Sequence, residues 1–153
     1  MEDILETISY GEKRRSIGRT IGEGDFSMLV NLNWTVGPIH ADREHMKSTE
    51  FGERILPGVC VLSTTIGLAN TSRVRSLMAA QGLRLVALLG FESVRFTGPV
   101  YPGDTITVES EILDARPSSD PTRCVARLKD VTSRQTGEIV LEAVRTELYE
   151  LAT

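Results

Sequence analysis

The 153-residue sequence lacks an excess of basic residues, a long apolar run and a basic, apolar leader. Its formal net charge of -4 disfavours the phosphate backbone of nucleic acids as a partner. No apolar stretch reaches the roughly 20 residues that a membrane-spanning helix needs, and residues 1–6 are rich in acids, unlike a signal peptide. We therefore expect a cytoplasmic protein that binds neither nucleic acid nor membrane.

Cysteine and histidine are scarce, with two of each. Cys60 and Cys124 lie in separate apolar stretches without CxxC spacing, so we expect two small buried thiols and no disulfide. The sequence contains no metal-ligand cluster of His, Cys and carboxylates and no glycine-rich phosphate loop. We therefore expect neither a metal nor a cofactor.

Hydrophobic residues make up 41% of the chain and charged residues 25%, which is typical of a globular domain. The length suits a single domain over residues 1–153, and no linker-like stretch or internal repeat divides it. Helical patterns fill the first half and strand patterns the second. This order indicates an α+β fold in which helices cover one face of a sheet.

The strongest helical pattern runs from Gly58 to Ala80. Apolar residues recur every three or four positions and predict a helix with one stripe on a hydrophobic surface: Val59, Leu62, Ile66, Ala69 and Leu77. Pro57 suits the start of this helix, because the first amide of a helix has no partner within it. Shorter helices are expected over 23–33 and over 42–49, the latter with Asp42 as N-cap.

Beyond Gly82 the apolar period becomes that of strands, either continuous or alternating. The expected strands cover 85–89, 93–96, 106–112, 125–132 and 138–151, joined by turns and loops at 102–104, 116–122 and 136–138. A long central helix wrapped by a curved antiparallel sheet is the hot-dog fold. The edge strand of such a sheet has unpaired backbone groups, which a second copy of the chain can cover by pairing with them. We therefore expect a homodimer.

The ordered segments from about Thr20 to the C-terminus resemble the MaoC-like hydratases, the hot-dog family that contains the (R)-specific enoyl-CoA hydratases. They comprise the helix before the active loop, the histidine segment Pro-Ile-His-Ala-Asp, the start of the central helix and two later pieces, at residues 21–32, 38–42, 51–58, 93–96 and 99–105. The resemblance implies a hot-dog fold and a substrate that is an acyl-CoA or acyl-carrier-protein thioester.

The active loop of that family reads Gly-Asp-x-Asn-Pro-Ile/Leu-His, and its Asp and His together activate water. The histidine matches His40, whereas Thr35 occupies the acid position and Trp34 that of a small residue. Pro57-Gly58 stands where the family often has His-Gly, and Ile66 stands where it has a serine. These differences from the family all lie at the expected active site, whereas the residues expected to form the scaffold match the family.

The resemblance implies that His40 is the catalytic base, a role that a neutral imidazole fills near cellular pH. Thr35 is expected to hold water or substrate. Amides near Gly58, at the positive end of the central helix, are expected to bind the thioester oxygen. The expected substrate-binding set is Trp34, Pro57, Gly58, Val59, Leu62 and Ser63. Trp34 either packs at the dimer seam or narrows the pocket.

A threonine hydroxyl orients water but does not accept its proton near neutral pH, so three hypotheses stay open. The first is a hydratase or dehydratase of acyl thioesters. The second is an acyl-CoA thioesterase on the same fold. The third is a non-catalytic acyl-thioester-binding subunit that pairs with an active homologue. Four acids near the site are candidate replacements for the missing carboxylate, although helix capping or a solvated surface suits them better: Glu23, Asp25, Asp42 and Glu44.

Overall fold

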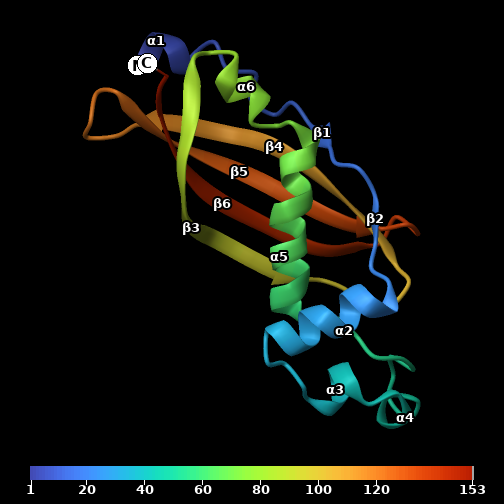
Figure 1. Ribbon diagram of the computed structural model, residues 1–153. Coiled ribbons are helices and arrows are strands. Elements are labelled where there is room, and N and C mark those ends of the chain that lie inside the picture. The colour runs from blue at the N-terminus through green and yellow to red at the C-terminus, as the bar shows by residue number, and fades with distance from the viewer. Residues whose placement is uncertain (153) are drawn as a thin grey trace.

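The computed structural model describes residues 1–152. A six-stranded antiparallel sheet curves around one helix, α5, which crosses its concave face (Figure 1). The strand order is β1-β4-β5-β6-β3, with β2 also paired to β4. Helices α2, α3 and α4 lie at the start of α5, whereas α1 and α6 lie beyond its end (Figure 1). This is the predicted α+β hot-dog fold.

The strands are β1 Arg14–Arg15, β2 Arg19–Thr20, β3 Leu83–Phe96, β4 Thr105–Pro117, β5 Arg123–Arg134 and β6 Ile139–Leu151. The helices are α1 Glu2–Leu5, α2 Glu23–Leu32, α3 Pro38–Ala41, α4 Arg43–Met46, α5 Gly58–Ala69 and α6 Ser76–Ala79. The two short helices expected before α5 are thus present as α2 and α4. Asp42 caps α4 as predicted, because its Oδ1 accepts a hydrogen bond from the His45 amide at 2.9 Å.

Buried and half-buried residues alternate along β4, β5 and β6. In β4, Ile106, Val108 and Ile112 are fully buried, whereas their neighbours on the other face are half-buried. Successive side chains of a strand point to opposite faces of the sheet, so one face is packed against the helices. The last three predicted strands are therefore confirmed.

The single helix predicted over 58–80 is wrong in its second half. Helix α5 ends at Ala69, a 3-10 turn covers Asn70–Ser72, and Arg73 has a left-handed backbone with φ 60°. The Thr71 hydroxyl donates to the Leu68 carbonyl at 2.8 Å, and the Ser72 hydroxyl donates to the Ala69 carbonyl at 2.7 Å. Side-chain hydroxyls thus add hydrogen bonds to carbonyls in the last turn of the helix.

The predicted apolar stripe of α5 is also wrong in its rotation. The buried residues are Cys60, Val61, Thr65, Leu68 and Ala69, so only Ala69 of the predicted stripe on α5 is among them. Because α5 is apolar on nearly every side, periodicity alone does not select the face that meets the sheet. A polar contact lies on the buried face, where the hydroxyls of Thr65 and Thr132 are 2.7 Å apart.

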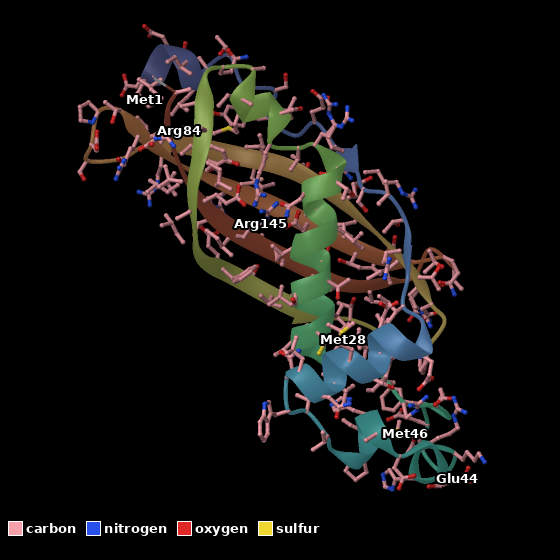
Figure 2. The ribbon with its side chains drawn as sticks, viewed as in Figure 1. Met1, Met28, Glu44, Met46, Arg84 and Arg145 are labelled. Carbon is pink, nitrogen blue, oxygen red and sulfur yellow. The ribbon has the colours of Figure 1, made fainter. Side chains whose placement is uncertain are left out.

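Two hydrophobic clusters fill the concave side, one beneath α5 and one beneath α1 and α6. Fully buried charged residues of β5 and β6 lie between them. Arg145 donates to the Asp130 carboxylate at 2.6 Å and also bonds Glu147. Arg75, which follows α5, bonds the same glutamate. Figure 2 shows Arg145 on the side of the sheet that faces α5. We call Arg75, Asp130, Arg145 and Glu147 the charged layer.

Strand β3 forms one edge of the sheet and departs from the burial pattern of the other long strands (Figure 1). Its pairing with β6 contains three register shifts. Six of its large apolar side chains are 38 to 54% exposed: Leu85, Val86, Leu88, Leu89, Phe91 and Phe96. Within residues 1–152, no helix is both long and apolar enough to cross a membrane.

Candidate functional site

His40 lies on the one-turn helix α3, which begins at Pro38 after the extended Gly37. The imidazole is half-buried, and its Nδ1 is 2.7 Å from the carbonyl oxygen of Ile55. A carbonyl only accepts hydrogen bonds, so Nδ1 carries the proton in this contact. In the neutral ring, Nε2 is then the nitrogen with a free lone pair. This tautomer suits a general base.

A cavity of about 550 Å³ lies beside His40. Its lining comes from α3, the segment before α5, the start of α5 and the end of β3, and consists of Ile39, His40, Phe51, Ile55, Leu56, Gly58, Val61, Phe96, Thr97, Gly98 and Pro99. Nearly all of these side chains are apolar. The volume falls within the range of about 300 to 1,000 Å³ typical of small-molecule sites. We call this space the larger cavity.

The start of α5 brings Gly58 into the larger cavity. The amides of Cys60 and Val61 both donate to the Pro57 carbonyl, at 2.9 and 3.0 Å. The amides of Gly58 and Val59 precede them and have no partner within the helix. A Cβ on Gly58 would lie 3.0 Å from the Phe96 ring. Glycine therefore allows the Phe96 ring to approach the first turn of α5 closely.

A second cavity of about 180 Å³ also borders His40. It lies among α2, α3 and Arg54, and is lined by Phe26, Ser27, Val30, Asn31, Val36, His40, Ala41 and Arg54. The Arg54 guanidinium bonds both oxygens of Glu23, at 2.9 and 2.8 Å, and Glu53 at 3.1 Å. It also lies 5.3 Å from the centre of the Phe26 ring. We call this space the smaller cavity.

The ion pairs of Arg54 shift the titration of both of its partners. Hydrogen bonds from the Arg54 side chain hold the pKa of Glu23 below its ordinary value. The Arg54 amide, with further bonds from the Arg54 and Arg43 side chains, lowers the pKa of Glu53. Both acids are consequently held as carboxylates beside the guanidinium.

Thr35 and Trp34 lie outside both cavities. The Thr35 amide and hydroxyl both donate to the Val30 carbonyl, at 3.1 and 3.3 Å, and so close the C-terminal end of α2. Trp34 adopts a left-handed backbone with φ 57° and is 89% exposed. In the single chain, therefore, the structure does not bring either residue to the His40 cavity.

The orientation of α5 decides which of the other expected substrate-binding residues are buried and which are exposed. Pro57 is buried and Leu62 is packed against the core, whereas Val59 is 54% exposed and Ser63 is exposed. None of these four lines the larger cavity. Gly58 alone of the six expected substrate-binding residues shares that cavity with His40.

The four candidate acids are engaged elsewhere. Glu23 bonds Arg54, Asp25 bonds the Gly22 amide and Arg19, and Asp42 caps α4. Glu44 pairs with Lys47, and Figure 2 shows it at the far side of α4 from α5. Among the residues that line either cavity, none is an Asp or a Glu. His40 thus faces these spaces without a carboxylate from its own chain.

Sequence reasoning missed one wall of the larger cavity, the segment Phe96–Pro99 at the end of β3. The exposed Phe96 and the following Gly98-Pro99 give no signal that they lie against His40, which precedes them by more than fifty positions. Cys60 was expected to be a buried thiol, and it is fully buried, with burial raising its pKa. Residues 1–152 contain no group of three or more His, Cys, Asp or Glu side chains arranged to hold a metal ion.

The curved sheet, the buried helix and the histidine at its start define a protein of the hot-dog class. The family model described as the MaoC like domain matches residues 10–135. The chain therefore belongs to the MaoC-like dehydratase family.

Known relatives agree with this assignment. The chain is 42% identical to the 3-hydroxyacyl-(acyl-carrier-protein) dehydratase FabZ of Thermus thermophilus over 118 residues, covering 76% of this chain and 78% of that protein. It is 32% identical to Protein MaoC of Klebsiella aerogenes over 104 residues, covering 68% of this chain but 29% of that protein. The solved structure of a monoamine oxidase regulatory protein from Archaeoglobus fulgidus has a TM-score of 0.81 at 30% identity, covering 97% and 94% of the two chains.

Proposed function

We propose that this protein is a hydro-lyase of acyl thioesters, which hydrates an enoyl thioester or dehydrates a 3-hydroxyacyl thioester. The observation that carries the proposal is the meeting of His40 and the first turn of α5 in one apolar cavity. Membership of a dehydratase family and the likeness to a 3-hydroxyacyl-(acyl-carrier-protein) dehydratase support it.

In this proposal the acyl chain occupies the larger cavity and the thioester oxygen accepts hydrogen bonds from amides at the start of α5. The positive end of the helix dipole stabilises the negative charge that develops on this oxygen. His40 removes a proton from water through Nε2, while Nδ1–H remains bonded to Ile55. The Ile55 carbonyl keeps the ring oriented and stabilises its protonated form.

Thr35 has a lesser role in this mechanism than its sequence position implies. Its hydroxyl donates to the Val30 carbonyl and lies outside the cavities around His40. We therefore assign the proton transfer to His40 and assign Thr35 to the geometry of the loop that leads to α3. The direct handling of water or substrate by Thr35 stays a prediction without support from the single chain.

We further propose that the protein is a homodimer formed through the β3 edge. The exposed apolar side chains of β3 support this, because an uncovered edge strand with apolar side chains favours association. Light scattering on the purified protein should give twice the chain mass of 16.8 kDa. A monomer at micromolar concentration would contradict this assembly.

The reaction is tested by adding purified protein to crotonyl-CoA, to longer enoyl-CoA esters and to enoyl-carrier-protein esters. Hydration predicts loss of the conjugated enoyl-thioester absorbance without release of free thiol, which a thiol reagent measures in parallel. Release of thiol with the alkene intact would instead identify a thioesterase. No change with any substrate at high protein concentration would contradict the proposed hydro-lyase.

A non-catalytic binding subunit is the alternative that a specific observation favours, namely the missing carboxylate around His40. The variant Thr35→Asp separates the two functions. A large gain of hydratase activity from an inactive parent would indicate an intact site that lacks its acid. Saturable binding of a thioester without turnover in either protein would select the binding subunit.

A further inference from the structure

His40 lies at the boundary of two cavities whose linings have no other residue in common. The larger cavity is bounded by α5 and the end of β3, whereas the smaller one is bounded by α2, α3 and Arg54. A molecule in one cavity therefore leaves the other cavity free. The two spaces also differ in size and in chemistry.

The size of the smaller cavity decides what it can hold. Its volume of about 180 Å³ is below the ~300 Å³ at which small-molecule sites begin. Liquid water occupies roughly 30 Å³ per molecule, so the space suits about six waters. The Ser27 hydroxyl, the Asn31 amide and the Arg54 guanidinium line it and offer hydrogen-bonding partners to water.

Arg54 is the one charged side chain among the described residues that line the smaller cavity, and it is already held in ion pairs. The Arg54 guanidinium already bonds Glu23 through Nη1 and Nη2, and bonds Glu53 through Nε. Arg43 also pairs with Glu53 at 3.1 Å and lies 3.9 Å from Glu23, so two guanidinium groups balance the two carboxylates. The charge of Arg54 is therefore already compensated, and the residues described around the cavity offer no unpaired cation to an anionic ligand. The occupant that fits is small, neutral and polar.

We propose that the smaller cavity is a water chamber, through which water reaches His40 while an acyl thioester fills the larger cavity. This inference rests on the proposed hydro-lyase function. Hydration consumes one water per turnover, and a substrate that fills an apolar cavity excludes water from that side. A separate chamber supplies the reactant without requiring the thioester to leave.

The proposed step conserves atoms and electrons. The water oxygen forms a bond to Cβ of the enoyl thioester while one water proton passes to Nε2 of His40. The electron pair of the C=C bond moves to Cα, with negative charge on the thioester oxygen, and Cα then takes a proton from the imidazolium. The product is the 3-hydroxyacyl thioester. In the reverse direction the released water returns to the chamber.

The chamber is tested first without any assay of activity, by exchange of the imidazole Cε1 proton in deuterated water, followed on peptides by mass spectrometry. Ser27→Phe fills the smaller cavity, and Thr97→Trp narrows the larger one. Met28→Phe is the matched control, because this neighbour on α2 is 62% exposed and lines neither cavity. The exposed His45 is an internal reference in every sample.

Thr97→Trp alone should leave His40 exchange near the wild-type rate, since the chamber remains open. Adding Ser27→Phe should slow it several-fold, whereas adding Met28→Phe should not. Full protection of His40 by Thr97→Trp alone would overturn the proposal, as would equal exchange rates in the single and double variants. Where Ser27→Phe lowers the melting temperature, Asn31→Leu replaces it as the filling variant.

Turnover gives the second test. Ser27→Phe should lower kcat for crotonyl-CoA about 10-fold or more, because water is misplaced while the thioester still binds, and KM should stay within a factor of about two. Equal kcat in Ser27→Phe and Met28→Phe would overturn the chamber. If the wild-type protein hydrates no thioester, the proposed function fails, and the exchange experiment still decides whether the chamber reaches His40.

Discussion

The two ends of α5 pack against the rest of the chain in opposite ways. At its start, Gly58 and half-buried His40 border an apolar cavity of about 550 Å³. Beyond its end, Arg75 joins the charged layer, in which Asp130, Arg145 and Glu147 are fully buried. At the start of α5 a cavity remains, and one imidazole nitrogen of His40 has no hydrogen-bond partner within residues 1–152. Beyond its end, the buried charged side chains are paired with one another. We infer that the charged end holds the helix in place so that the start can remain open.

The largest expected effect comes from breaking the charged layer with Glu147→Gln. This residue bonds Arg75, Arg145 and Tyr149, and removing one member of a buried ion pair costs about 3 to 5 kcal/mol. Urea unfolding should show this loss in the free energy of unfolding. The control is Glu142→Gln on the same strand, which loses only a half-exposed pair with Lys129 and should change stability by less than about 1 kcal/mol. Equal losses in both variants would disprove the difference between the two sites.

A smaller loss is expected midway along α5 from Thr65→Val. The Thr65 and Thr132 hydroxyls are 2.7 Å apart and fully buried. Leaving one of them unsatisfied costs about 1 to 3 kcal/mol, whereas replacing both by apolar groups of similar shape is nearly neutral. The double variant Thr65→Val/Thr132→Val should therefore recover much of the lost stability in the same unfolding experiment. Strictly additive losses would show that the two hydroxyls do not depend on each other.

At the open end, Gly58→Ala should have a modest effect on stability of about 1 kcal/mol, near the lower limit for overpacking. The new Cβ would lie 3.0 Å from the Phe96 ring, but this ring is 51% exposed and has room to move. We expect the effect to appear mainly as a raised KM for a thioester. Adding Phe96→Leu should relieve the contact and restore KM. An unchanged KM in Gly58→Ala would place the acyl group away from the first turn of α5.

The smallest expected effect is a pH dependence of the Arg54 cluster beside the smaller cavity. The pKa of Glu23 is lower in the folded chain than its ordinary value. Its stabilising contribution is therefore present above the unfolded-state pKa and is lost as the pH falls through the folded pKa. Glu23→Gln should flatten the loss of stability on acidification from about pH 5 to pH 3. In the Arg54→Met background, the same change should leave the slope unaltered.

Much of the scaffold was predictable because it depends on local patterns. Alternation along β4 to β6, the Asp42 cap and the histidine segment before α5 are all visible in the residues themselves. The rotation of α5 about its axis was not predictable, since the helix carries apolar residues on nearly every side. The charged layer was also hidden, because Arg145 and Glu147 occupy inward positions of β6, where a strand pattern favours apolar residues.

The site was only partly predictable. His40 and Gly58 meet as the sequence implies, but the wall from Phe96 to Pro99 and the water chamber depend on tertiary packing between distant segments. Thr35 holds the sequence position of an acid, yet its hydroxyl is bonded to the end of α2. A position in a motif therefore identified the loop but not the side chains that border the imidazole.

The most direct measurement compares the wild-type protein and His40→Ala in the hydration of crotonyl-CoA at matched concentrations, after both are shown to be folded. We predict that the wild type adds water and that the variant loses about 10²- to 10⁴-fold in rate, the usual contribution of a general base. Equal rates in the two proteins would contradict the assignment of the chemistry to the imidazole at the start of α5.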